Sequence, residues 1–166
     1  MFDSHNSGLS HVDDDGHIRM VDVSNKDITP RRARAMSRVQ MSPETLALAL
    51  SQKGPKGEVF EVARIAGILA AKQTSQLIPL CHPLPLDHVD VQLKPCVVGE
   101  SLEIMATATT SSRTGVEMEA LTAAAVAALT VIDMLKAVDK NMTVTDLQVM
   151  EKAGGRSGDW SREEDA

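Results

Sequence analysis

The chain has 166 residues, a formal net charge of −6 at pH 7, one Trp, two Phe and no Tyr. This length supports one domain with a substantial core and is too short for two comfortable ones. The negative charge and the scarcity of aromatic side chains argue against a nucleic-acid-binding protein, which needs a basic face and, for single strands, aromatic stacking platforms.

The cysteines and the apolar runs bear on the expected cellular location of the protein. Cys81 and Cys96 stand alone, without CxxC or zinc-finger spacing, which is more typical of reduced cytosolic thiols than of a disulfide framework. The polar, acidic N-terminus lacks the apolar region of a secretory signal. The longest charge-free run of the main predicted helix, residues 120–132, is too short to span a bilayer. We therefore expect a soluble cytoplasmic protein that binds neither membrane nor nucleic acid.

Residues 1–16 are rich in Asp, Ser, Asn, Gly and His. They cannot bury enough apolar surface to order themselves, so we expect a disordered tail. The irregular spacing of His5, His11 and His17 favours solvated side chains over metal ligands, and no metal site is predicted.

The next segments predict strands. Residues 18–23 can form a short edge strand. Residues 31–41 alternate between Ala, Ser, Val or Met and mostly Arg, which indicates a strand with one solvent-exposed face. The alternative for this second segment is an Ala- and Arg-rich helix.

Two helices and a loop follow. Ser42 as N-cap and Pro43 at the first helical position predict a helix that ends near residue 52. Residues 53–57 form a loop in which two lysines and two glycines precede a helix and could bind an anion. The spacing is not that of a P-loop, so a solvated turn is the commoner explanation. Residues 58–76 predict a second helix.

The run LIPLCHPLPL, at 77–86, is an apolar loop stiffened by three prolines. His82 is its only ionisable group apart from Cys81. The pair could be a nucleophile with its base, or two metal ligands, but adjacent side chains seldom aim at one point. A His satisfied within an ordered loop is the default interpretation, although such a loop would also hold a ligand-facing His still.

The second half of the chain completes the fold. Residues 89–93 alternate as a half-buried strand, and 102–109 form its antiparallel partner. A long helix comes next, and 142–151 predict a last strand. The element order is the β-α-β-β-α-β pattern of ferredoxin-like α+β folds. We expect one domain over 17–158, ending in a basic glycine-rich loop, and an acidic tail over 159–166.

The long helix is predicted from Glu117 to Lys140 and is opened by a capping-box pattern at 114–117. Between residues 120 and 138 only Asp133 and Lys136 are charged. The other side chains make the helix apolar almost all round, so we expect these two groups to leave bulk water together. Since desolvation makes a buried ion pair a poor source of stability, the pair is either structural or an acid/base site, and the residues alone leave both open.

Several long motifs follow one another along the chain: LIPLCHPL at 77–84, GVEMEALTA at 115–123 and DMLKAV at 133–138, with shorter runs at 20–24, 56–60 and 63–67. Together they resemble the family of cyclic pyranopterin monophosphate synthases of molybdenum cofactor biosynthesis. The likeness covers residues 20–158. Long motifs in the same order are far more specific than any short pattern.

The resemblance implies a ferredoxin-like subunit in a homohexamer, a trimer of dimers, with active sites at subunit boundaries. It implies a nucleotide-derived substrate, 3′,8-cyclo-7,8-dihydro-GTP, which a preceding radical enzyme makes from GTP. The implied reaction forms a pyranopterin with a cyclic phosphate and releases diphosphate. No cofactor is implied with certainty, and Mg²⁺ could accompany the substrate phosphates.

The resemblance also assigns residues. The family's catalytic Asp matches Asp133 and its partner matches Lys136, and we hypothesise that they act as general acid and base. Substrate contacts match the proline-rich loop and the helix start, at Leu80, Cys81, His82, Met118 and Glu119. Supporting basic positions match Arg31, Lys56, Lys72 and Lys152, and Glu117 is a further polar candidate. Arg156 stands where the family often has Lys, which keeps the charge but alters donor geometry.

Two other function classes share this topology. A non-catalytic regulatory module would bind a small nucleotide effector at a subunit interface, and the fold does not choose between it and an enzyme. An RNA-binding domain is disfavoured by the absent aromatics and the negative charge.

Overall fold

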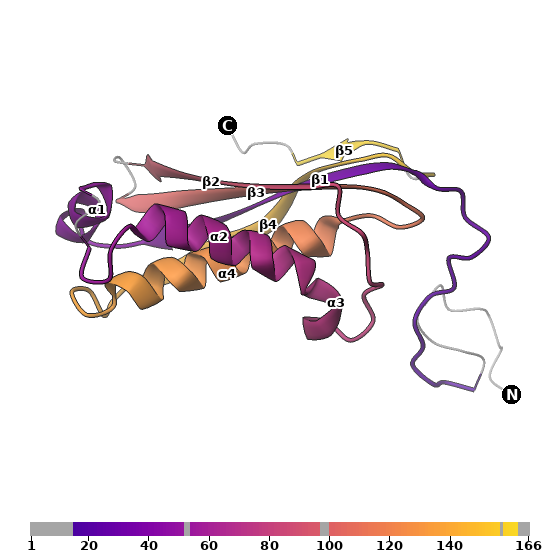
Figure 1. Cartoon of the computed structure of the whole chain (residues 1–166), viewed down its shortest axis with the longest axis horizontal. Helices are drawn as coiled ribbons and strands as arrows, with labels where there is room; N and C mark the ends of the chain where they lie inside the picture. The colour runs from indigo at the N-terminus through magenta and orange to yellow at the C-terminus, as the bar shows by residue number, and fades with distance from the viewer. Residues whose placement is uncertain (1–14, 52–53, 97–99, 157, 163–166) are drawn as a thin grey trace, which may run out of the picture.

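The structure is a computed structural model that describes residues 15–51, 54–96, 100–156 and 158–162. Most of the predicted N-terminal tail, and the end of the acidic tail, lie outside the described residues. Within them the fold is α+β, with a five-stranded antiparallel sheet and its long helices on one face (Figure 1). The predicted α+β class is confirmed.

The sheet has the strand order β2-β3-β1-β4-β5. Its strands are β1 (Thr29–Gln40), β2 (His88–Cys96), β3 (Ser101–Ser112), β4 (Thr143–Ala153) and β5 (Trp160–Ser161). The helices are α1 (Pro43–Leu50), α2 (Val59–Lys72), α3 (Thr74–Leu77) and α4 (Glu117–Leu135).

The central strand β1 shows why the alternating pattern folds as it does. Ala33, Ala35 and Val39 are fully buried, whereas Arg32 lies exposed on the opposite face. β1 pairs with β3 over its whole length and with β4 on its other side. The predicted strand is confirmed, and the alternative Ala- and Arg-rich helix is wrong.

Helix α4 is the core helix. Its small side chains let it lie close to the sheet and to α2, and five of them are fully buried: Ala120, Ala123, Ala124, Ala127 and Ala128. A Cβ on Gly67 of α2 would lie 2.9 Å from the carbonyl oxygen of Ala123, so glycine is needed at this crossing. By length and composition α4 is the one helix of the described residues that could cross a membrane. Its burial against β1, β3 and α2 accounts for that composition.

The shorter helices follow their local signals. The Ser42 hydroxyl accepts a hydrogen bond from the Thr45 backbone N–H at 3.2 Å, as the N-cap prediction requires. The predicted helix over 58–76 is divided in two at Gln73. There the Thr74 hydroxyl donates to the Ala71 carbonyl at 3.0 Å and competes with the backbone for that acceptor.

Two predictions of local structure are wrong. Residues 18–23 form no strand beyond a single bridge at Ile18. Ile18 and Met20 stay exposed there, so the segment gains no burial by pairing. The capping box at 114–117 does not form, because Val116 is the N-cap and the Glu117 carboxylate pairs with Lys152 instead.

The long helix is also shorter than predicted, because it ends at Leu135 rather than at Lys140. The chain turns there, and the Asp139 backbone N–H donates to the Leu135 carbonyl at 3.2 Å. The Asp139 carboxylate accepts from the backbone N–H groups of Ser42 and Asn141. These bonds lower the pKa of Asp139 and tie the end of α4 to the start of α1.

Candidate functional site

Asp133 lies in the last turn of α4 between two lysines. Its carboxylate is 2.6 Å from Nζ of Lys136 and 2.7 Å from Nζ of Lys56, which comes from the turn before α2. The hydrogen bonds from Lys136 and Lys56 lower the pKa of Asp133 to about 2. The carboxylate is therefore ionised at neutral pH.

The prediction that Asp133 and Lys136 are buried together is wrong. Their side chains are 53% and 60% exposed. The reason is the early end of α4, which places both groups where the helix leaves the core. In the single chain they form an exposed charge cluster with Lys56, of a kind that contributes little to stability.

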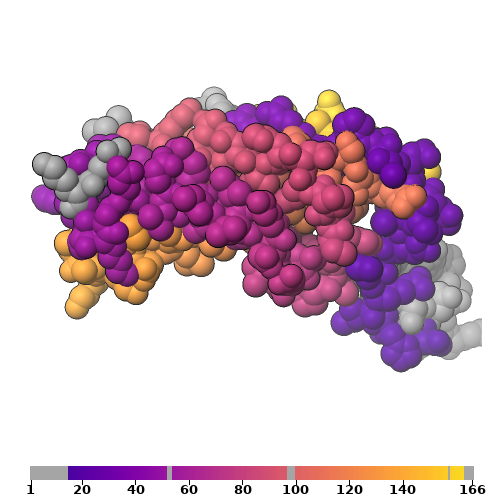
Figure 2. All heavy atoms as spheres, viewed as in Figure 1, coloured from indigo at the N-terminus to yellow at the C-terminus, as the bar shows by residue number. Residues whose placement is uncertain are grey.

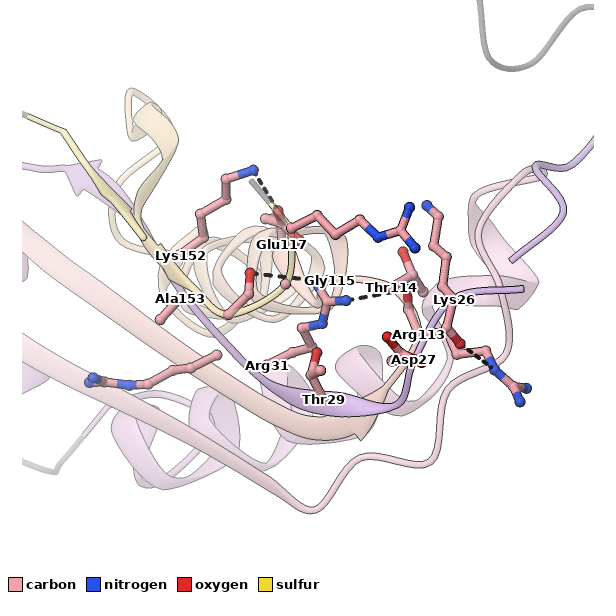
Figure 3. Close-up of a pocket in the computed structure, with 14 residues that line it drawn as sticks. Lys26, Asp27, Thr29, Arg31, Arg113, Thr114, Gly115, Glu117, Lys152 and Ala153 are labelled. Carbon is pink, nitrogen blue, oxygen red and sulfur yellow. Dashed lines mark hydrogen bonds and ion pairs between the residues drawn. The ribbon is translucent and has the colours of Figure 1, made fainter. Parts of the chain in front are cut away.

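A cavity of about 520 Å³ opens at the other end of α4 (Figure 3). It is lined by the start of β1, the β3–α4 connection, the end of β4 and the segment before β1. Two of its lining residues are acidic, Asp27 and Glu117, and six are cationic: Lys26, Arg31, Arg32, Arg113, Lys152 and Arg156. In a protein of negative net charge, such a concentration of cations creates a local positive field that would attract an anion.

Arg31 is held at the cavity by backbone carbonyls rather than by a carboxylate. Nη1 donates to the Gly154 oxygen and Nη2 to the Arg113 oxygen, both at 3.4 Å. Its Nε is buried and has no hydrogen-bond partner within the described part of the chain. Gly155 has a φ of 81°, and a Cβ there would collide with the guanidinium. The glycine turn thus leaves room for the guanidinium, which forms no ion pair within the described residues and whose planar fork suits a bidentate contact with phosphate oxygens.

Lys152 points toward Glu117 across the cavity (Figure 3). Nζ of Lys152 lies 3.4 Å from Oε1 of Glu117, the only ion pair inside the cavity among the residues that the structure describes. The structure therefore brings Arg31, Lys152 and Glu117 of the predicted site together. It adds Lys26, Arg32 and Arg113, which the sequence analysis missed. Lys26 and Arg113 are isolated cations on separate segments, and Arg32 was assigned only to the solvent-exposed face of its strand.

Besides the Asp133 cluster and the cavity, the proline-rich loop and the first turn of α4 form a third group of predicted site residues. Glu119 is 4% exposed, and burial raises its pKa, with Glu117 adding to the effect against a backbone hydrogen bond that lowers it. Burial and the nearby Glu119 raise the pKa of the Cys81 thiol, so Cys81 is a poor nucleophile. His82 donates from Nε2 to the Val21 carbonyl at 2.8 Å. This bond leaves Nδ1 as the acceptor nitrogen of a neutral ring, so the raised pKa of the Cys81 thiol is the observation that disfavours Cys81 as a nucleophile.

The remaining predicted contacts lie around this third group or apart from it. Leu80 is partly buried in the loop, and Met118 is 36% exposed at the start of α4. Lys72 is exposed in the last turn of α2 and makes no hydrogen bond or ion pair within the described ranges. Within those ranges no group of three His, Cys, Asp or Glu side chains is placed to hold a metal ion.

Helix α4 separates the Asp133 cluster from the cationic cavity within one chain. It rises about 1.5 Å per residue, which places Asp133 about 24 Å along the axis from Glu117. Figure 1 shows α4 running along the sheet from near the middle of the molecule to the end that carries α1. The cluster of Asp133, Lys136 and Lys56 therefore does not meet the cationic cavity in a single copy.

The amino-acid sequence that forms these elements matches a known family. The MoaC family model matches residues 20–155. The chain belongs to the MoaC family. The match includes every residue of the predicted site, from Arg31 to Lys152, while Arg156 lies just beyond it.

Curated relatives in the MoaC family are similar over nearly the whole chain. The chain is 56% identical to a cyclic pyranopterin monophosphate synthase of Chloroflexus aurantiacus over 162 residues, which is 98% of this chain and 99% of the relative. It is 59% identical to a protein of that name from Thermomicrobium roseum, over 95% of each chain. It is 57% identical to another from Streptomyces avermitilis, over 93% of this chain and 89% of the relative.

Proposed function

We propose that this chain is an enzyme of molybdenum cofactor biosynthesis that converts 3′,8-cyclo-7,8-dihydro-GTP into cyclic pyranopterin monophosphate and releases diphosphate. The observation that carries the proposal is 56% identity over 98% of the chain to a relative named for this product. The regulatory module is not favoured, because the relatives that match over this length are named synthases.

The cationic cavity is the proposed site for the triphosphate. Its volume, its six cations and the guanidinium of Arg31, which forms no ion pair within the described residues, support this placement. Phosphate oxygens accept charge-assisted hydrogen bonds from Arg and Lys, and these are the strongest such bonds in proteins. In this proposal Mg²⁺ arrives bound to the substrate phosphates.

The guanine-derived part of the substrate is assigned to the proline-rich loop and the start of α4. His82 and Glu119 orient it, with Leu80, Cys81 and Met118 as further contacts. The buried carboxyl of Glu119 adjoins this loop, as its effect on Cys81 indicates. Glu117 links this group to the cavity, because it influences Glu119 and pairs with Lys152.

Asp133, Lys136 and Lys56 are the proposed proton-transfer groups. A carboxylate with a pKa of about 2 is a weak base. In the free chain it therefore serves to hold the two ammonium groups in place. Desolvation by substrate or by a second copy would raise its pKa and make it a better base. Asp133→Asn and Lys136→Ala should each abolish pyranopterin formation in a protein that stays folded.

A second copy supplies this cluster to the cavity in the proposed homohexamer, a trimer of dimers. An exposed apolar stripe on α2, made of Val62, Ile65 and Leu69, supports such an assembly. In Figure 2 the surface of α2 faces the viewer, with no other helix covering it. Contiguous exposed apolar patches are typical of protein interfaces.

The finer fold assignment belongs to the same proposal. The antiparallel order β2-β3-β1-β4, with α2 and α4 on one face, supports a ferredoxin-like subunit to which β5 is added. We place the enzyme in the cytoplasm, directly after a radical GTP cyclase.

The test is turnover of the cyclic triphosphate by the purified protein. We expect one pyranopterin and one diphosphate for each substrate consumed, and neither product with Asp133→Asn. Glu44→Gln, a charge change on the exposed start of α1, is the matched control and should retain full activity. Saturable binding of the substrate with no products would support the regulatory module instead.

A further inference from the structure

Glu117 is an unexpected residue in a cavity that binds anions. Its carboxylate lies among six cationic residues and pairs with one of them, Lys152. Arg31, by contrast, donates to carbonyl oxygens and forms no ion pair among the residues that the structure describes. A carboxylate in such a place repels a phosphate ligand. Its presence therefore suggests that it has a separate task.

The local backbone allows the Glu117 side chain to fold over the start of α4. A Cβ on Gly115 would collide with the Glu117 carboxylate, so only glycine leaves room for it in this position. The two partners of the ion pair are only partly buried, with Glu117 31% and Lys152 36% exposed. Each group can therefore separate from the other without burying a bare charge, and an exposed pair of this kind is weak.

We propose that Glu117 is an internal anion that occupies Lys152 in the empty site, yields it to the substrate phosphates, and competes for it again when diphosphate has to leave. This inference rests on the proposed placement of the phosphates in the cavity. A phosphate group carries more charge than a carboxylate and wins Lys152 when the whole substrate is bound. After the reaction, diphosphate is held only by its own contacts, and Glu117 shortens its residence by rebinding Lys152. Glu117 is a positioning residue and makes no contact with reacting atoms.

The inference predicts a gain of affinity when Glu117 is removed. We would measure diphosphate binding to the full-length assembled protein by isothermal titration calorimetry at low ionic strength, where charge effects are least screened. Glu117→Gln keeps the shape of the side chain and removes its charge. It should tighten diphosphate binding by about fivefold, the factor expected from one partly exposed ion pair. Damage to the fold would weaken binding, so a gain cannot arise from misfolding.

Three variants make the measurement specific. Asp27→Asn removes the other carboxylate of the cavity, which forms no ion pair within the described residues, and should change the affinity less than Glu117→Gln. Glu44→Gln makes the same change in net charge at a residue that does not line the cavity, and should change the affinity much less than Glu117→Gln. In a Lys152→Met background the gain from Glu117→Gln should disappear, because the competing partner is gone.

The outcomes separate this inference from the function on which it rests. If Arg31→Met and Lys152→Met weaken diphosphate binding but Glu117→Gln leaves it unchanged or weaker, the phosphate site stands and the role of Glu117 is overturned. If Arg31→Met and Lys152→Met have no effect on diphosphate binding, the phosphates lie elsewhere, and both proposals fail at this cavity. Stronger inhibition of turnover by added diphosphate in Glu117→Gln would support the inference independently.

Discussion

Nζ of Lys56 lies 2.7 Å from Oδ2 of Asp133, which connects the turn before α2 with the last turn of α4. Lys136 approaches the other carboxylate oxygen of Asp133 from the same helix end. Two segments remote in sequence thereby place two ammonium groups on one carboxylate, at a surface that a second copy can cover.

The titration of Asp133 tests this arrangement. The folded pKa of about 2 lies below the ordinary Asp value of 3.8, so the carboxylate contributes to stability above pH 3.8, and the contribution is lost as the pH falls toward 2. Carbon-13 NMR of labelled Asp side chains should show this titration near pH 2 in the wild type. In Lys136→Met and in Lys56→Met the pKa should move toward 3.8, and an unchanged value in both variants would contradict the contact.

Gly155 should be essential to the cavity. Gly155→Ala imposes a left-handed φ on a residue with a side chain, at a cost of about 1–2 kcal/mol, and its Cβ also collides with the Arg31 guanidinium. We expect a lower midpoint of thermal unfolding and weaker diphosphate binding. Gly158→Ala is the matched control, because Gly158 has a φ of 68° and nothing within 4 Å of a Cβ. It should lower stability but spare binding, and equal binding by both variants would refute the role of Gly155.

The close crossing of α2 and α4 predicts whether Gly67→Ala raises or lowers the free energy of unfolding. In an exposed helix, Gly→Ala stabilises by up to about 1 kcal/mol. At Gly67 the added Cβ would meet the Ala123 oxygen at 2.9 Å and Cβ of Ala127 at 3.3 Å. Overpacking of this kind costs about 1–3 kcal/mol, so Gly67→Ala should lower the free energy of unfolding in urea. A stabilised variant would mean that the two helices have room to move apart.

The sequence predicted the parts of the fold that local chemistry decides. The alternation along β1 and the Ser42 cap were read correctly, because burial on one face and an N-cap hydroxyl act within a few residues. The exposure of Asp133 was not predicted, because it depends on where α4 ends. The Asp139 carboxylate, just after α4, accepts a hydrogen bond from the Ser42 backbone N–H, a contact between segments distant in the sequence.

The residues that line the cavity could also be predicted only in part from the sequence. Arg31, Lys152 and Glu117 were assigned by their resemblance to family positions. Lys26 and Arg113 were missed, because single cations in polar turns look solvated until the fold joins their segments. In the structure Nε of Arg113 donates to the Lys26 carbonyl at 3.0 Å, a contact that no sequence pattern announces.

Complementation between two inactive variants tests the central claim most directly. Asp133→Asn removes one half of the proposed site and Lys152→Met removes the other, so each protein alone should be inactive. Coexpressed in equal amounts, with mixed oligomers verified by native mass spectrometry, they should recover up to about a quarter of wild-type pyranopterin formation, because one site in four then joins two intact halves. Verified mixed oligomers that form no pyranopterin would contradict a site built from two copies of this chain.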